Sequence, residues 1–312
     1  MITKKQGGIK MDAIRIEGLR KSFGKIKAVD GLSFCVRCGE LFAFLGANGA
    51  GKSTAISIIC GEARPDGGEI FIDGESISGS RGGIQKKIGV VFQSTALDTS
   101  LSARDNLKSR AALYGIFGDE FSERLSELCR LFDLFTLLDR PISHLSGGQR
   151  RRIDLARALI HKPKILILDE PSTGLDPKTR AMLWQAVSAL RKAQGLTVLL
   201  TTHYMEEAAE ADRVLIIDKG RAVAEGAPFE LKTKYAEDYI TVYGQSEEKI
   251  STLGCRYERV AGAYRISVPN TRVATELILR SPELFVDYEI TKGKMDDVFL
   301  AVTGKNMGGD LK

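Results

Sequence analysis

One segment limits the fold more than any other: a glycine-rich loop between an apolar run and a helix-forming run. The apolar run covers 40–45, and the loop reads GANGAGKS over 46–53. A short apolar run that ends at a glycine is typical of a buried strand of a parallel sheet. The residues after Lys52 place apolar side chains at helical spacing. This order of strand, glycine turn and helix predicts an α/β fold with an anion site at the helix N-terminus.

The composition of this loop suits it to phosphate groups. Glycines allow a tight turn in which several backbone N–H groups point at phosphate oxygens. Lys52 is expected to reach the β and γ phosphates, and the Ser53 hydroxyl is expected to ligate Mg²⁺. A glycine turn that binds nothing is the alternative, but all four fixed positions of the motif are filled. The residues predicted to bind nucleotide here are Gly46, Ala47, Asn48, Gly49, Ala50, Gly51, Lys52, Ser53 and Thr54.

Two carboxylates follow a second apolar strand, predicted over 165–168. Open α/β sheets bind their ligands at the carboxyl ends of the strands, where Asp169 and Glu170 lie. Asp169 is expected to hold the hydration shell of Mg²⁺, since hard cations prefer oxygen ligands. Glu170 is the natural base for an attacking water molecule. A solvated acidic turn after a core strand is the other interpretation.

A second glycine motif, LSGGQ over 145–149, begins another helix. Ser146 is predicted to cap the N-terminus of a helix over 150–159. Gly147 and Gly148 allow close backbone approach, so this helix start is a second anion cradle. One chain therefore carries two helix starts that suit phosphate.

These motifs, in this order and spacing, resemble those of the ABC ATPases over most of the chain. The resemblance implies that Phe23 stacks on adenine and that Gln93 joins the catalytic core to a helical subdomain. It identifies Asp176 with the loop at the dimer contact and His203 with the switch histidine that stabilises the γ-phosphate. Taken singly, Phe23 is as typical of a core aromatic, Gln93 is more typical of a surface amide, and His203 is more typical of a hydrogen-bonded histidine.

The resemblance assigns each motif a role in ATP hydrolysis. It implies catalytic roles for Glu170, His203, Gln93 and Lys52, and metal ligation by Ser53, Gln93 and Asp169. It also implies that Ser146, Gly147, Gly148 and Gln149 of one subunit close over ATP held by the other. Because the chain has one set of motifs and no internal duplication, a head-to-tail homodimer is the simplest assembly.

Composition excludes several other classes of protein. The net charge of the 312-residue chain is +5 and is spread along it, which is too weak a signal for nucleic-acid binding. No apolar run approaches the roughly 20 residues of a membrane helix. Five cysteines, an odd number, suit a reducing cytoplasm. Residues 1–11 are polar and basic, and we expect a disordered tail there.

The pattern of elements predicts an ABC-type P-loop ATPase domain of the α/β class over 12–227. It has a mixed sheet core, an antiparallel β layer and a helical insertion at about 98–161. A small α+β domain is expected over 228–312, with strands at 239–243, 264–268 and 285–290 and a helix at 271–279.

The end of the chain, 295–304, together with 204–208, resembles the ABC-2 type exporter ATPases, the group that includes the daunorubicin exporter ATPase. That resemblance implies an ATP- and Mg²⁺-dependent exporter subunit on the cytoplasmic face of the cell membrane. Its partner would be an ABC-2 type permease, docked near Gln93, and it would meet the membrane only through that permease. The alternatives are a soluble ABC ATPase that acts on ribosomes or DNA, an importer ATPase, and a regulator that binds nucleotide without turnover. The first lacks support because the chain has neither a second ATPase domain nor a long coiled-coil insertion.

Overall fold

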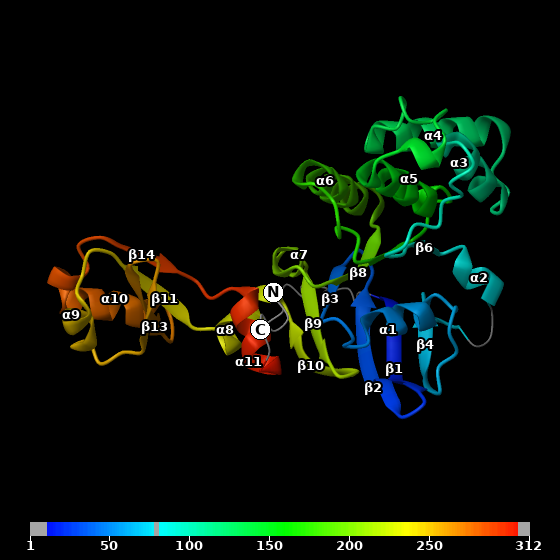
Figure 1. The fold of residues 1–312 in the computed structure, drawn as a ribbon. Helices are drawn as coiled ribbons and strands as arrows, with labels where there is room; N and C mark the ends of the chain where they lie inside the picture. Colours follow the sequence, from blue (N-terminus) through cyan, green and yellow to red (C-terminus); the bar gives the residue numbers. More distant parts are fainter. Residues whose placement is uncertain (1–10, 78–80, 305–312) are drawn as a thin grey trace, which may run out of the picture. The chain divides into compact units, whose positions relative to one another are not determined.

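The computed structural model describes residues 11–77 and 81–304 (Figure 1). Residues 1–10 of the predicted N-terminal tail lie outside the described residues. The described chain divides into two compact units. The first comprises the residues up to His203 together with Ile217–Ala222, and the second comprises Tyr204–Ile216 and the residues from Val223 onward.

The central sheet holds six strands, and four neighbours in it, β3, β8, β7 and β6, are parallel. Every residue of β3, β7 and β8 is buried. Strands covered on both faces read as continuous apolar runs, which explains the predicted strands. The sheet order is β10 (Arg221–Gly226), β9 (Arg213–Asp218), β3 (Leu41–Leu45), β8 (Thr197–Thr202), β7 (Ile165–Asp169) and β6 (Ile88–Val91).

A second, antiparallel sheet covers the core next to β3. Its order is β2 (Ile26–Arg37), β1 (Asp12–Phe23), β4 (Gly67–Ile72) and β5 (Glu75–Ser76). Phe34 of β2 stacks on Phe42 of β3 with ring centroids 5.4 Å apart. This sheet forms the antiparallel layer that the sequence predicted, and it packs on the parallel strands through aromatic side chains.

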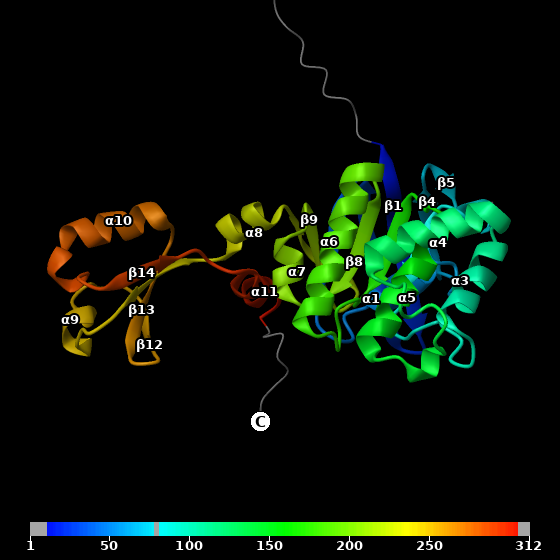
Figure 2. The same cartoon turned by 90° about the horizontal axis from the view of Figure 1, so that it is seen from above.

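Helices complete the first unit, and α3, α4 and α5 pack against one another (Figures 1 and 2). In α4, Phe121, Leu125, Leu128 and Phe132 are buried at helical spacing, as an amphipathic helix requires. The helices of this unit are α1 (Lys52–Ile59), α2 (Arg81–Gln85), α3 (Ala103–Ala112), α4 (Gly118–Phe132), the 3₁₀ turn η1 (Ile142–His144), α5 (Gly147–Leu159) and α6 (Pro177–Gln194).

The second unit contains a four-stranded antiparallel sheet with a helix, α10, against it. The strand order is β12 (Tyr257–Val260), β13 (Ala263–Val268), β11 (Asp238–Val242) and β14 (Tyr288–Thr291). Its helices are α7 (Met205–Ala209), α8 (Pro228–Tyr235), α9 (Glu247–Ser251), α10 (Thr271–Arg280), the 3₁₀ turn η2 (Pro282–Leu284) and α11 (Met295–Thr303).

Two features of this unit differ from the sequence prediction. The strand predicted over 285–290 begins only at Tyr288, because η2 precedes it and turns Phe285 into the apolar core. Strand β12 was not predicted. It forms a hairpin with β13 through Ala261 and Gly262, which both have positive φ, as a two-residue hairpin turn requires. In the described part of the chain, no helix combines the length and apolarity needed to cross a membrane.

Candidate active site

The phosphate loop packs so tightly against β2 that glycine is required within it. Gly51, which caps α1, has φ 108°, and a Cβ there would lie 2.2 Å from the carbonyl oxygen of Ala28. Gly49 also has positive φ, at 78°. Only glycine tolerates both the conformation and the close approach at Gly51. The loop thus delivers the N-terminus of α1 to the carboxyl end of β3.

Lys52 is buried at the start of α1 and bonds back to its own loop. Its Nζ donates hydrogen bonds to the carbonyl oxygens of Gly46, at 2.7 Å, and Ala47, at 3.2 Å. The same Nζ lies 3.5 Å from Glu170 Oε1, and the two side chains are only 4% and 9% exposed. Burial lowers the pKa of Lys52, while the neighbouring Glu170 opposes that shift.

Asp169 ends β7 within reach of two hydroxyl groups. Its Oδ1 accepts hydrogen bonds from Ser53 Oγ, at 3.5 Å, and from Thr201 Oγ1. Thr201 Oγ1 also accepts from the backbone N–H of Glu170, at 3.0 Å. Thr201 was not predicted to take part in the site, although a threonine near the end of an otherwise apolar strand is a signal that could have identified it.

Glu170 stands at the centre of the predicted catalytic residues. Its Oε2 accepts a hydrogen bond from Gln93 Nε2, at 3.4 Å, and lies 3.4 Å from His203 Nδ1. Its backbone has φ 47°, the left-handed conformation that is uncommon for residues other than glycine. Lys52, Gln93 and His203, far apart in the sequence, therefore converge on one carboxylate.

These side chains border a cavity of about 750 Å³. Its wall carries three lysines, Lys27, Lys52 and Lys219, a charge that suits a polyphosphate. Of the predicted site residues, the structure brings Asn48, Gly49, Gly51, Lys52, Ser53, Thr54, Gln93, Glu170 and His203 to this wall. Lining residues that the sequence did not suggest are Ile26, Lys27, Ala28, Thr173 and Lys219.

Some predicted residues do not line the cavity. Phe23 ends β1, pairs with Ile26 across the hairpin and is 55% exposed, whereas Ile26 is at the wall. The signature residues and Asp176 are also outside the lining, as are Gly46, Ala47, Ala50 and Asp169. Asp169 nevertheless reaches the lining through its hydrogen bond with Ser53.

The signature forms the capped N-terminus of α5, as predicted for Ser146. Gln149 N donates to Ser146 Oγ at 3.2 Å, and Ser146 N donates to Gln149 Oε1 at 3.0 Å, a reciprocal capping box. The helix begins at Gly147, three residues before the predicted start. A Cβ on Gly148 would lie 3.0 Å from Thr179 Oγ1 and 3.5 Å from Asp176 Oδ2. The signature thus lies beside Asp176, which caps α6.

The oxygen donors at Ser53, Gln93 and Asp169 are the type that Mg²⁺ prefers. The Ser53 hydroxyl and the Asp169 carboxylate already lie 3.5 Å apart, at the carboxyl end of β7 and beside Lys52. This donor set fits a divalent cation bound together with the phosphates of ATP.

Comparison with known proteins gives the family. The model of the ABC transporter family matches residues 29–173. The chain is 38% identical over 306 residues to the Nod factor export ATP-binding protein I of Ralstonia nicotianae, with 94% of each chain covered. It is also 38% identical over 307 residues to the daunorubicin resistance ATP-binding protein DrrA2 of Streptomyces coeruleorubidus, covering 94% of this chain and 95% of that one.

Solved structures agree with these relatives. The ATP-binding subunit of an ABC transporter matches with a TM-score of 0.67 and 27% identity, over 77% of this chain and 98% of that one. A dimeric bacterial ABC transporter cassette matches with a TM-score of 0.63 and 29% identity, over 69% and 98%. A dimeric cassette in a post-hydrolysis state, bound to ADP and Pi, matches with a TM-score of 0.63 and 28% identity, over 69% and 98%. The chain belongs to the ATP-binding subunits of ABC transporters, in the group of the ABC-2 type exporter ATPases.

Proposed function

We propose that this chain hydrolyses ATP to drive export through a separate ABC-2 type permease on the cytoplasmic face of a cell membrane. The curated relatives are named for Nod factor export and daunorubicin resistance, which supports export over import. The single observation that carries the catalytic part is the convergence of Lys52, Gln93 and His203 on Glu170 in one cavity.

The proposed chemistry is in-line attack of water on the γ-phosphate. Glu170 accepts a proton from the water as the new oxygen–phosphorus bond forms and the bond to ADP breaks. Lys52 and the loop N–H groups hold the β and γ phosphates, and His203 stabilises the γ-phosphate. When bound by Ser53, Gln93 and Asp169, Mg²⁺ supplies positive charge to the phosphate oxygens.

We further propose a head-to-tail homodimer. The signature residues of a chain do not line that chain's own cavity, yet they form a capped helix N-terminus that suits an anion. A second copy would place this helix start over the ATP of its partner, and Phe23 and Asp176 would complete the nucleotide site. The dimeric relatives support this assembly.

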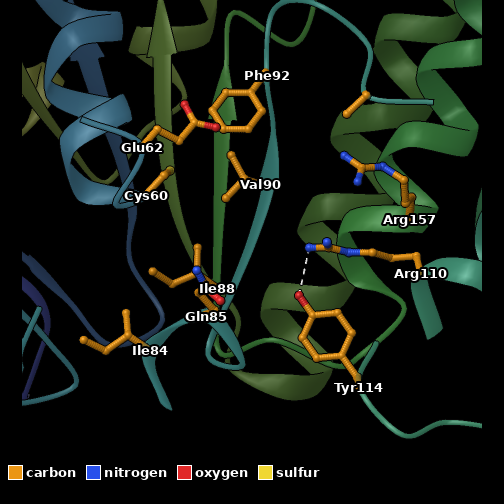
Figure 3. Close-up of a pocket in the computed structure, with 11 residues that line it drawn as sticks. Cys60, Glu62, Ile84, Gln85, Ile88, Val90, Phe92, Arg110, Tyr114 and Arg157 are labelled. Carbon is orange, nitrogen blue, oxygen red and sulfur yellow. Dashed lines mark hydrogen bonds between the residues drawn. The ribbon is translucent and has the colours of Figure 1, made fainter. Parts of the chain in front are cut away.

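A groove next to Phe92, the residue before Gln93, is the proposed docking site for the permease (Figure 3). It encloses about 310 Å³ between β6 and the helices α3 and α5. Ile88, Val90 and Phe92 give it an apolar side, and Arg110 and Arg157 extend into it from the two helices. A short helix of the permease with apolar side chains would fit there.

The domain limits proposed from the sequence are kept: an ATPase domain over 12–227, with the helical insertion at about 98–161, and an accessory domain over 228–312. In this arrangement the insertion contributes Arg110, Tyr114 and Arg157 to the docking groove, and the rest of the groove and the nucleotide site belong to the remainder of the ATPase domain.

A crosslinking experiment tests the proposed function. Burial raises the pKa of Cys60 in the groove to about 12, so its thiol would react slowly with a thiol-directed crosslinker. We would therefore introduce a photo-reactive residue at Gln85, which lines the same groove and is exposed. We expect crosslinks from Gln85 to a membrane protein in native membranes, and none from the exposed Lys192 on α6. Crosslinks to ribosomal or DNA-repair proteins instead would refute the exporter role and leave the ATPase chemistry intact.

A further inference from the structure

Arg151 lies five residues after Ser146, in the first turns of α5, and points into the protein. Its side chain is 10% exposed. The guanidinium donates to four backbone carbonyl oxygens: Pro171 through Nε at 2.9 Å, Phe92 through Nη1 at 2.5 Å, and Glu170 and Asp169 through Nη2 at 3.1 and 3.5 Å. One side chain thus joins the signature helix to the segments that carry Gln93 and Glu170.

The charge of this buried group has nearby compensation. Arg151 Nη1 lies 3.8 Å from Asp154 Oδ2, and Asp154 in turn accepts a hydrogen bond from Arg157 Nε at 3.0 Å. Burial lowers the pKa of Arg151, and the carboxylates of Asp154 and Asp169 oppose that shift. A guanidinium stays protonated even so, since its ordinary pKa is above 12.

The backbone of Glu170 needs such support. Its left-handed φ of 47° is a strained conformation for a residue with a side chain, and it persists only where the surroundings hold it. Its N–H donates to the carbonyl oxygen of Thr201 at 3.1 Å and to Thr201 Oγ1 at 3.0 Å. Its carbonyl oxygen accepts from Arg151 Nη2 at 3.1 Å and, within its own turn, from the N–H of Thr173 at 3.3 Å. Strand β8 therefore holds one side of this residue and helix α5 holds the other.

We propose that Arg151 is a positioning residue for ATP hydrolysis: its guanidinium fixes the backbone of Glu170 and of Phe92 to the helix that begins at Ser146. The inference rests on the proposed role of Glu170 as the base. Arg151 acts through Glu170 and Gln93, whose side chains it aims at the attacking water. It also links the signature of a protomer, which closes over the partner's ATP, to the base in its own site.

The variants Arg151→Lys and Arg151→Gln test this, because alanine would remove the donor that four buried carbonyl groups share. Misplacement of a catalytic group by about 1 Å costs roughly 100-fold in rate, so we expect kcat to fall by that order in Arg151→Gln and by less in Arg151→Lys. KM for ATP should stay near the wild-type value, since neither variant alters the phosphate loop.

Arg152 supplies the matched control on the same helix. Its Nη1 donates to the carbonyl oxygens of Phe132 and Asp133, at 3.1 and 3.0 Å, which border no part of the cavity. Arg152→Lys should keep kcat within about twofold of wild type. In the Glu170→Gln background, adding Arg151→Lys should lower the residual single-turnover rate little further, because the two residues act as one unit.

Three results would overturn the proposal: wild-type kcat in Arg151→Lys and Arg151→Gln, loss of ATP affinity in step with kcat, or failure of both variants to fold in a thermal melt. The last two would assign Arg151 to the stability of the fold. Failure of the proposed function would be recognised by different results: a wild-type chain that does not hydrolyse ATP, or a Glu170→Gln variant that hydrolyses ATP at the wild-type rate.

Discussion

Lys52 and Glu170 form a buried ion pair, with Lys52 Nζ 3.5 Å from Glu170 Oε1 and both side chains less than a tenth exposed. One partner comes from the phosphate loop and the other from the end of β7. Buried charges interact more strongly than charges at the surface, so a change in the charge of either group changes the pKa of the other. We therefore expect phosphate bound beside Lys52 to change the electrostatic environment of the carboxylate proposed to activate water.

Replacing Glu170 with glutamine should abolish turnover and spare ATP binding. A general base contributes roughly 10²- to 10⁴-fold to a rate, and the amide cannot accept the proton. We expect a phosphate-release assay to show a loss of that size, and gel filtration with ATP to show a stable dimer. Glu248→Gln, at an exposed position on α9, is the control. Normal turnover by Glu170→Gln would remove Glu170 from the base role.

Lys52→Ala should weaken ATP binding by about 2 kcal/mol, or roughly 30-fold in Kd, the value of a hydrogen bond to a charged group. Because burial lowers the pKa of Lys52, its charge in the free protein is lost at a lower pH than the usual 10.5. As the pH is raised above neutrality, the Kd for ATP of the wild-type chain should therefore begin to rise before pH 10.5 is reached. Calorimetry between neutral and alkaline pH would check this, and Lys52→Ala should lack the dependence. A flat wild-type profile would contradict it.

Ser146→Ala separates the structural and the functional use of a helix cap. Loss of an N-cap costs about 1 kcal/mol of stability, and a similar cost is expected for Ser102→Ala, since Ser102 also accepts from a first-turn N–H, that of Asp105 in α3. Thermal melts should show equal losses for the two variants. Only Ser146→Ala should also reduce ATP hydrolysis, because Ser146 is proposed to close over the partner's ATP. Equal activity in the two variants would refute that role.

His161 should make the fold less stable in mild acid. Its ring stacks on Tyr114 with centroids 3.9 Å apart, its Nε2 lies 3.1 Å from the carbonyl oxygen of Ile88, and burial lowers its pKa to about 4. The unfolded chain binds this proton at about pH 6.5 and the folded chain only near 4, so stability is complete above 6.5 and falls as the pH drops between these values. The loss is on the order of 2 kcal/mol after allowance for partial solvent screening. Urea denaturation at several pH values should show a weaker dependence in His161→Phe, which keeps the stacked ring.

Asp238→Asn should loosen the second unit alone. Asp238 is buried, and its carboxylate accepts from Lys292 Nζ at 2.7 Å, Thr271 Oγ1 at 2.8 Å and the N–H of Gly293 at 3.4 Å. The amide cannot accept all three bonds with the same strength, a loss of about 2 kcal/mol. Hydrogen exchange should become faster in β11 and β14 and stay unchanged in β3 and β7. Faster exchange in β7 would show that Asp238 stabilises more than its own unit.

Local patterns in the sequence identified the motifs because each is a short run with its own chemistry. The apolar strand, the glycines and Lys52 of the phosphate loop are contiguous, and so are β7 and its two carboxylates. Ser146 is predicted as a cap because a serine directly before a helix-forming run is itself a local signal. Family resemblance alone assigned roles to Phe23, Gln93 and His203, which the local pattern would not have singled out; the cavity wall includes Gln93 and His203 but not Phe23.

The tertiary structure alone decided which side chains meet. Convergence of Lys52, Gln93 and His203 on Glu170 depends on the strand order of the parallel sheet. That order brings together residues up to 151 positions apart, such as Lys52 and His203. No local pattern in the sequence indicates this convergence. Arg151 sits between two other arginines and has no distinguishing pattern, yet it alone of the three reaches the carbonyl groups of Phe92 and Glu170. Such roles follow from long-range packing, whereas periodicity and turn chemistry report only on neighbours within a few residues.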